Sequence, residues 1–186
     1  YRPRDVVRQF GISLRRELDF AAECRSAERI ARNFEAFEDI VVPRVHWDYV
    51  SERLNVQDFV AGVPGSAMER LDAAGLDRVE LARRGAAAIL KMVLEDGFFH
   101  ADPHPGNLLV MDDGRLAFFD FGMVGRITPE LQSKMIDALF HVVGKDPAGI
   151  AQDLIDLDFL KPGTNPNIVR PVVEKMFEFH LNLKLK

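Results

Sequence analysis

The chain has 186 residues, of which 47% are hydrophobic and 28% charged, and its formal net charge is −5. This length is sufficient for one domain with a sizeable core. The acidic balance argues against a general nucleic-acid-binding surface, which would be basic. The single cysteine, Cys24, excludes an internal disulfide framework and suits a reducing compartment. No apolar run reaches transmembrane length and no signal peptide is present. Because the first residue is Tyr1, we expect a fragment of a longer protein.

Apolar residues at helical spacing predict a long amphipathic helix over residues 3–37, either unbroken or broken once, with a weak point at Gly11. An acidic group, Glu17, Asp19 and Glu23, lies on it. Asp19 and Glu23 are i,i+4 neighbours and repel each other when both are ionised. From the residues alone, this group is a solvated acidic face.

Two apolar runs, 40–50 and 53–60, predict two antiparallel strands joined by a short turn. Pro43 indicates an irregular or edge position in the first strand. The segment 61–65 is rich in turn residues and is either a plain connector or a hinge between two lobes.

Two helices are expected next, a short one over 66–71 and a longer one over 77–96. Apolar residues spaced by three and four predict a buried stripe on the longer helix, with Gly97 as its C-terminal cap. The stripe consists of Val79, Ala82, Ala86, Ile89 and Val93. Phe98 and Phe99 follow, and we expect both in the core.

Two short apolar runs, Leu108–Met111 and Leu116–Phe119, are separated by an Asp-Gly pair and predict a β-hairpin. The hairpin brings Asn107 and Asp120 to one end, close to Asp102. Oxygen ligands for a hard cation together with a spare carboxylate are what a metal-assisted phosphoryl-transfer site needs.

The order and spacing of these residues match two kinase motifs. His100 to Asn107 reads H-x-D-x-x-x-x-N, and Asp120 begins D-F-G. The full string H-A-D-P-H-P-G-N resembles the UbiB (AarF-domain) family of atypical kinase-like proteins. The resemblance extends over about residues 1–145.

This resemblance implies an α+β, protein-kinase-like fold with a mostly helical large lobe at 63–186. Residues 1–62 would be the C-terminal part of a truncated small lobe, namely helix C and its last two strands. Asp102 would be the catalytic base or orienting carboxylate. Asn107 and Asp120 would bind Mg²⁺ and, through it, the phosphates of ATP.

Other nucleotide contacts are also implied by the resemblance. Glu23 would be the helix-C glutamate that pairs with a nucleotide-binding lysine, while Glu17 and Asp19 would engage a lysine of the family's N-terminal extension. The hinge backbone at Asp58 and Val60 would contact the adenine ring. No lysine-bearing strand and no phosphate loop precede these residues here, so we expect the fragment alone to be impaired in nucleotide binding.

The two histidines of the motif have different expected roles. His100 packs and hydrogen-bonds to hold the loop. His104 has no counterpart in ordinary protein kinases and either orients Asp102 or the phosphate end, or is structural. A rival interpretation takes His100, Asp102, His104 and Asp120 as the zinc or iron site of a hydrolase. The flanking prolines argue against the paired strand that this site would need.

Three further helices are expected after the hairpin. Thr128-Pro129-Glu130 is typical of a helix start, so we predict a helix over 129–143, then others over 146–160 and 168–180. The tail at 177–186 fits either strand or helix. The short interval after Gly122 leaves no room for a long activation loop, which disfavours protein substrates and favours a small-molecule or lipid-linked kinase, or an ATPase.

The function implied is an Mg-ATP-dependent atypical kinase or ATPase that serves ubiquinone or other isoprenoid-lipid biosynthesis. Its partners would be an adenine nucleotide and an isoprenoid lipid or a lipid-biosynthesis enzyme complex, with no nucleic acid. The location would be cytoplasmic, with peripheral contact to the inner membrane. The alternative is a non-catalytic pseudokinase scaffold that binds nucleotide or lipid.

Overall fold

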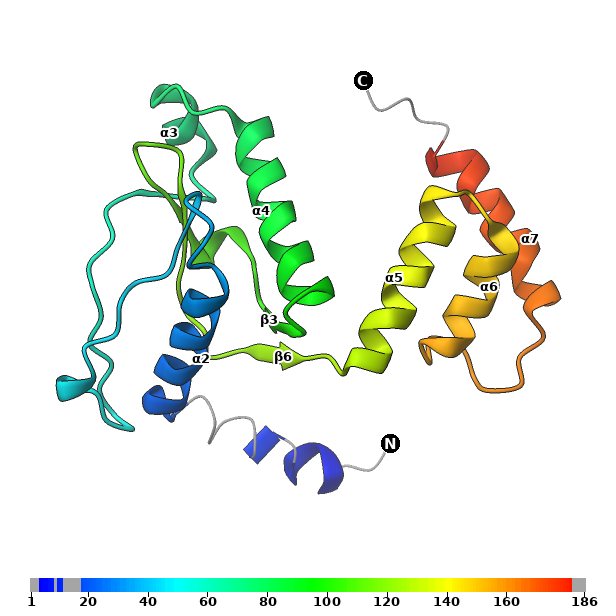
Figure 1. The fold of residues 1–186 in the computed structure, drawn as a ribbon, viewed down its shortest axis with the longest axis horizontal. Helices are drawn as coiled ribbons and strands as arrows, with labels where there is room; N and C mark the ends of the chain where they lie inside the picture. The colour runs from blue at the N-terminus through cyan, green and yellow to red at the C-terminus, as the bar shows by residue number, and fades with distance from the viewer. Residues whose placement is uncertain (1–3, 9, 12–17, 182–186) are drawn as a thin grey trace. The chain divides into compact units, whose positions relative to one another are not determined.

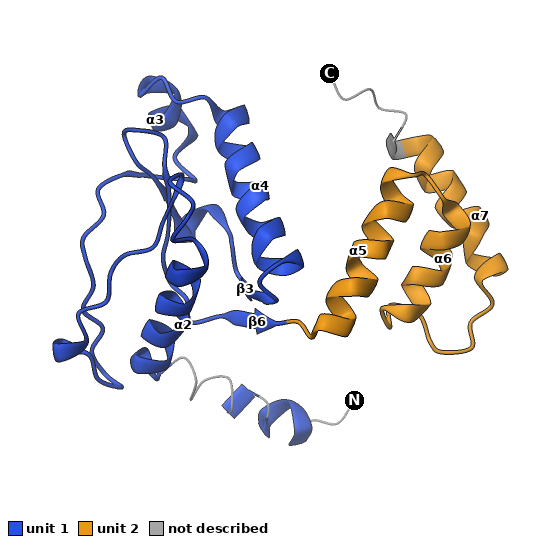
Figure 2. Cartoon of the chain, viewed as in Figure 1, with its two compact units in different colours: residues 1–126 blue, residues 127–186 orange. Residues whose placement is uncertain are grey.

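The computed structural model describes residues 4–8, 10–11 and 18–181 (Figure 1). The chain divides into two compact units, Tyr1–Arg126 and Ile127–Lys186 (Figure 2). The lobe boundary predicted between residues 62 and 63 falls within the first unit and stays a prediction.

The first unit contains helix α2 (Phe20–Asn33). Asp19 has non-helical backbone angles, and its carboxylate accepts a hydrogen bond from the backbone N–H of Ala22 at 3.0 Å. An N-cap of this kind starts a helix, so the pattern expected over 3–37 is broken, which is one of the two forms predicted, and α2 begins at Phe20. Residues 4–8 and 10–11 are helical as a separate piece, while Glu17 lies outside the described residues. The helix also ends earlier than predicted, because Phe34 turns inward and packs edge-on against Phe37, at 5.5 Å between ring centroids.

A four-stranded sheet has the order β1-β5-β4-β2. Its strands are β1 (Ile40–Val41), β2 (Val63–Pro64), β4 (Leu108–Val110) and β5 (Leu116–Phe118). The predicted hairpin is confirmed as β4 and β5, with Leu109 opposite Ala117. Gly114 has φ +81°, a left-handed conformation that glycine adopts without steric cost.

The two strands predicted over 40–50 and 53–60 are wrong for most of their length. Only β1 is a strand, and it pairs in parallel with β5 instead of with 53–60. The remainder is an irregular antiparallel ribbon with isolated bridges at Val45–Gln57 and Ser51–Leu54. A 3-10 turn at Trp47–Tyr49 interrupts the ladder. Pro43 has no N–H to donate, which is consistent with the end of β1 before it.

Helices α3 (Met68–Ala73) and α4 (Arg78–Leu94) follow β2. The buried stripe predicted for α4 is wrong, because Val79 is 80% exposed, whereas Ala88 and Met92 are buried. The buried face is displaced by about one residue, since apolar residues surround much of this helix. Gly97 has φ +58° and lies just after the helix end, as predicted for a capping glycine.

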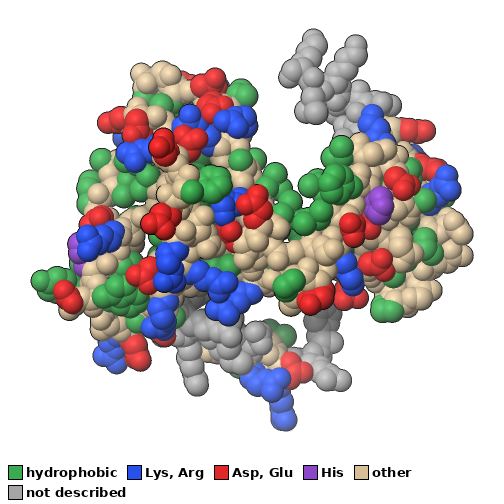
Figure 3. All heavy atoms as spheres, in the orientation of Figure 1, with side chains coloured by type: hydrophobic (Ala, Val, Ile, Leu, Met, Phe, Trp, Pro, Cys, Tyr) green, Lys and Arg blue, Asp and Glu red, His purple; other side chains and the backbone are tan. Residues whose placement is uncertain are grey.

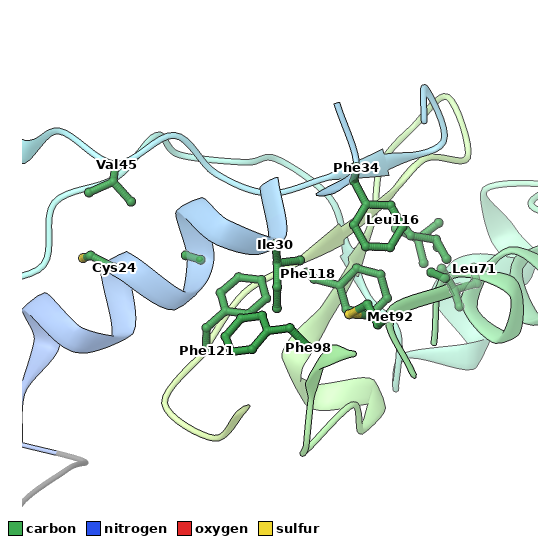
Figure 4. Close-up of a cluster of buried hydrophobic side chains, with 13 residues drawn as sticks. Cys24, Ile30, Phe34, Val45, Leu71, Met92, Phe98, Leu116, Phe118 and Phe121 are labelled. Carbon is green, nitrogen blue, oxygen red and sulfur yellow. The ribbon is translucent and has the colours of Figure 1, made fainter. Parts of the chain in front are cut away.

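The core of the first unit lies where α2 and α4 meet the hairpin (Figure 4). Its completely buried large side chains include Ile30, Met92, Phe98, Leu116 and Phe121. The core position of Phe98 is confirmed, while Phe99 is half-buried. Cys24 is buried, as expected, and its Sγ donates a hydrogen bond to Asn55 Oδ1 at 3.1 Å.

A second sheet pairs β3 (Phe98–His100) with β6 (Val124–Arg126) in antiparallel register. Phe98 lies opposite Arg126, and His100 lies opposite Val124. This short ribbon joins the start of the catalytic motif to the segment after Asp-Phe-Gly.

The second unit is helical, with α5 (Pro129–Val143), α6 (Pro147–Asp156) and α7 (Pro166–Met176), then a π-helical turn over Phe177–Leu181. The bounds predicted for α5 are confirmed, and Thr128 Oγ1 accepts the backbone N–H of Leu131 at 3.3 Å. The tail is therefore helical as far as Leu181. Within the described ranges, no helix is long and apolar enough to cross a membrane.

Candidate active site

The loop between β3 and β4 carries the first candidate residues. After His100 the chain leaves β3, runs without regular structure to a 3-10 turn at Pro105–Asn107, and enters β4. The His100 side chain is 1% exposed and packs against Phe121, with 5.3 Å between ring centroids. Its Nδ1 accepts the backbone N–H of Asp102 at 3.2 Å. This is the anchoring position that the sequence indicated for His100.

The side chain of Asn107 ties the loop together. Its Nδ2 lies 3.2 Å from the backbone oxygen of Asp102 and 3.4 Å from Asp102 Oδ2. Because the amide nitrogen is committed to Asp102, the amide oxygen is the group that can face a cation. The backbone N–H of Phe119 donates to the Asn107 carbonyl at 3.3 Å, which fixes Asn107 beside the segment that bears Asp120.

Asp120 occupies a strained backbone position next to this pair. Its φ is +60°, and its exposed side chain contrasts with the neighbouring Phe121 ring, which is 2% exposed. A left-handed conformation in a residue other than glycine costs about 1–3 kcal/mol and is concentrated at functional sites. Asp and Asn tolerate it better than most residues. Anchoring of Phe121 in the core therefore turns the Asp120 carboxylate outward.

Glu23 reaches the same segment from α2. Burial raises the pKa of its carboxyl, the negative charge of Asp120 raises it further, and a hydrogen bond from the Phe121 backbone N–H partly opposes both. The solvated acidic face inferred from the residues is thus wrong for Glu23, which is half-buried. Spacing along α2 could not reveal this, because Asp120 and Phe121 come from far along the chain.

The two motif histidines differ in exposure. Burial lowers the pKa of His100, while nearby backbone carbonyls and the carboxylates of Asp120 and Asp102 oppose this effect. His104 is more exposed; its Nδ1 accepts the Gly106 N–H at 2.9 Å, and its Nε2 lies 3.6 Å from Asp102 Oδ2. The latter distance is too long for a hydrogen bond.

The set of oxygen donors fits Mg²⁺. This ion commonly takes one or two protein oxygens and completes its shell with water and phosphate, so Asn107 and Asp120 suffice. The zinc or iron interpretation is wrong on geometry. His100 is buried at the end of β3, no strand continues to His104, and no group of three His, Cys, Asp or Glu side chains in the described ranges is arranged for a metal.

The predicted hinge residues, Asp58 and Val60, precede β2, which pairs with β4 of the hairpin. Asp58 Oδ1 is 2.6 Å from His46 Nε2, a pairing that the sequence did not indicate. Val60 is half-buried, and its contact with adenine stays a prediction. Two links tie this segment to the catalytic hairpin: β2 pairs with β4, and the Gly65 N–H donates to the Leu108 carbonyl at 2.8 Å.

Sequence reasoning missed one ion pair that supports the site. Lys91 Nζ lies 2.6 Å from Asp96 Oδ1, and both side chains are only 12% exposed. The ammonium also lies 5.1 Å from the ring centroids of both Phe34 and Phe37. The pair holds the corner between α4 and β3. The i,i+5 spacing of Lys91 and Asp96 is not a helical-face spacing. The two residues meet at the end of α4, where the backbone N–H of Asp96 donates to the Lys91 carbonyl at 3.0 Å.

The sequence and the fold of this chain were both found to be similar to those of known proteins. Residues 1–154 match the ABC1 atypical kinase-like domain. The chain belongs to the ABC1 atypical kinase-like family. Its resemblance to the UbiB and AarF-domain proteins, inferred from H-A-D-P-H-P-G-N, is thereby confirmed.

Two relatives illustrate the match. Protein ACTIVITY OF BC1 COMPLEX KINASE 8, chloroplastic, of Arabidopsis thaliana is 36% identical over 159 residues, covering 84% of this chain and 21% of the relative. Uncharacterized protein slr1919 of Synechocystis sp. is 36% identical over 172 residues, covering 92% of this chain and 30% of the relative. The ABC1-family chain thus spans less than a third of the length of these relatives.

A solved structure supports the fold. The structure titled "The complex structure of Rv3197-erythromycin from Mycobacterium tuberculosis" superimposes with a TM-score of 0.67 at 20% identity, covering 94% of this chain and 44% of that one. Together with the family match, this confirms the kinase-like α+β fold.

Proposed function

We propose that the full-length protein is an Mg-ATP-dependent atypical kinase or ATPase that supports ubiquinone or other isoprenoid-lipid biosynthesis. One observation carries the proposal: the Asn107 side-chain amide donates hydrogen bonds to Asp102, and Asp120 lies exposed beside this pair. A phosphoryl-transfer site needs such a carboxylate beside two oxygen ligands for the metal.

Each residue then has a chemical task. The Asn107 oxygen and the Asp120 carboxylate would hold Mg²⁺, which supplies positive charge to the phosphates of ATP. Asp102 would accept the proton of the attacking hydroxyl or water, or orient it. Glu23 would pair with the family's nucleotide-binding lysine. Burial, and after it the charge of Asp120, raises the pKa of the Glu23 carboxyl, and a lysine ammonium beside it would offset both effects. The backbone at Asp58 and Val60 would contact adenine.

The segment after Asp-Phe-Gly supports a substrate smaller than a protein. Only β6 and one short connection separate Gly122 from Pro129, where α5 begins. A long activation segment that could present a peptide has no place between them. An isoprenoid lipid, or a lipid-biosynthesis enzyme complex at the face of the inner membrane, is the partner that we propose, with the protein otherwise cytoplasmic.

A non-catalytic scaffold is the second candidate. It is favoured by one contact: the carboxyl of Glu23 already accepts the Phe121 N–H, an arrangement that needs no nucleotide. The two candidates differ in turnover and not in fold.

Calorimetric titration of ATP, with and without magnesium, tests the proposal on the full-length protein and on this chain. Asp120→Asn removes the charge but keeps a residue that tolerates φ +60°. Asp112→Asn, in the exposed hairpin turn, is the matched control. We expect the full-length protein to show magnesium-dependent binding that is lost in Asp120→Asn and kept in Asp112→Asn, and this chain alone to bind ATP more weakly.

The outcomes separate the candidates. Binding with ATP hydrolysis or phosphoryl transfer that Asp102→Asn abolishes indicates the enzyme. Binding by the full-length protein without turnover indicates the scaffold. Magnesium-independent binding, or equal binding by Asp120→Asn, would refute the proposed metal-nucleotide site.

A further inference from the structure

Two arginines cover one buried aromatic ring of the first unit. The ring of Phe98 is 2% exposed, and the guanidinium carbons of Arg29 and Arg126 lie 4.1 Å and 5.6 Å from its centroid. Arg29 comes from α2, whereas Arg126 is the last residue of β6 and lies directly opposite Phe98 in the β3–β6 ribbon. Lys and Arg side chains gather over this part of α2 and β6 in Figure 3.

Neither arginine forms an ion pair with a carboxylate in the described part of the chain. Other arginines of the same unit do, since Arg25 lies 3.6 Å from Asp19 and Arg84 lies 3.0 Å from Asp39. A guanidinium that stacks on an aromatic face uses its π-surface and leaves its N–H donors free in the plane. Phe98 therefore has two guanidinium groups within 5.6 Å of its ring centroid, and neither group is paired with a carboxylate of the described residues.

We propose that Arg29 and Arg126 form a phosphate-binding site that takes free phosphate or the phosphate group of a small phosphomonoester. Two positive charges match the charge of a phosphate dianion, and its several oxygens can receive bidentate hydrogen bonds from both guanidinium groups at once. A carboxylate has one charge and two oxygens, so it satisfies only one arginine in this way.

Occupancy of this site would connect two elements that frame the candidate active site. Helix α2 also carries Glu23, and β6 follows the segment of Asp120 and Phe121. A phosphate shared by Arg29 and Arg126 would hold α2 against β6 and keep Glu23 in place. This consequence for nucleotide affinity rests on the proposed function, whereas phosphate binding itself does not.

The test measures binding of inorganic phosphate without nucleotide, by calorimetry and by the phosphate-dependent rise in melting temperature. Chloride keeps the ionic strength constant, and sodium acetate serves as the carboxylate comparison. The variants are Arg29→Gln and Arg126→Gln. The control is Arg32→Gln, which changes an exposed arginine of the same helix that does not stack on the Phe98 ring. Glycerol phosphate replaces inorganic phosphate in a parallel titration.

We expect Arg29→Gln and Arg126→Gln each to weaken phosphate binding about tenfold or more, because each variant loses a charge-assisted hydrogen bond to the phosphate. Arg32→Gln should bind as the parent does. If Arg29→Gln fails to fold, Arg29→Lys and the exposed Arg126→Gln decide the matter. No binding, an equal loss in Arg32→Gln, or equal stabilisation by acetate would overturn the assignment. None of these outcomes depends on ATP binding, so the proposed function can fail independently.

Discussion

Substitution of Lys91 by methionine tests how much a buried ion pair at the corner between α4 and β3 stabilises the first unit. The change keeps most of the apolar volume but removes the ammonium from Asp96, with which it forms a 2.6 Å contact at 12% exposure of either side chain. Asp96 Oδ2 is already buried without a hydrogen-bond partner in the described structure, so the variant leaves a charged carboxylate almost uncompensated.

Removal of one partner from a buried ion pair costs about 3–5 kcal/mol. We expect the lower end, about 3 kcal/mol, because a little of the Lys91–Asp96 pair reaches solvent. For a chain of this size, each kcal/mol corresponds to about 2–4 °C, so the melting temperature should fall by about 6–12 °C. Fluorescence of Trp47, the single tryptophan, reports unfolding of the first unit in urea or on heating.

The double variant Lys91→Met, Asp96→Asn is the decisive control. With the charge removed from both positions, most of the lost stability should return, because replacement of a whole buried pair by neutral groups is often nearly neutral. Two results would refute the reasoning: a loss below about 1 kcal/mol in Lys91→Met, or a double variant no more stable than the single one.

Three further changes have defined outcomes. Gly85→Ala in α4 should raise the free energy of unfolding by about 1 kcal/mol, since alanine is the better helix former and its Cβ would meet no atom closer than 3.7 Å; a decrease in urea melts would contradict this. Gly62→Ala should lower the free energy by about 1–3 kcal/mol, because its Cβ would lie 2.8 Å from the backbone oxygen of Val110; unchanged stability in the same melts would show that the strands adapt. The hydrogen bond to Asp153 raises the pKa of His141, so its stabilising effect is fully present below the unfolded-state pKa near 6.5 and is lost as pH rises through the folded-state value. Circular-dichroism melts between about pH 5.5 and 8.5 should show this slope, and His141→Gln should remove it; an equal slope in the variant would assign it to other groups.

Local features of the sequence predicted several elements correctly. The Asp-Gly turn of the hairpin and the Thr-Pro-Glu start of α5 depend on backbone preferences within a few residues, and both are confirmed. The motif around Asp102 and the Asp120 triplet identified the family from short strings alone. These predictions succeeded because the interactions that determine them lie close together along the chain.

Predictions that required a partner from elsewhere in the chain were less accurate. The spacing of Asp19 and Glu23 does not show that the first caps a helix while the second faces Asp120. The apolar run over 40–50 does not show that β1 pairs with β5. The sequence of α4 is apolar on several sides, so it does not show which side of the helix is buried. The sequence by itself determined the hairpin, the start of α5 and the family. Only the tertiary structure decided the buried face of α4, the pKa of Glu23 and the stacking of Arg29 and Arg126 on Phe98, because burial and charge depend on which distant residues meet.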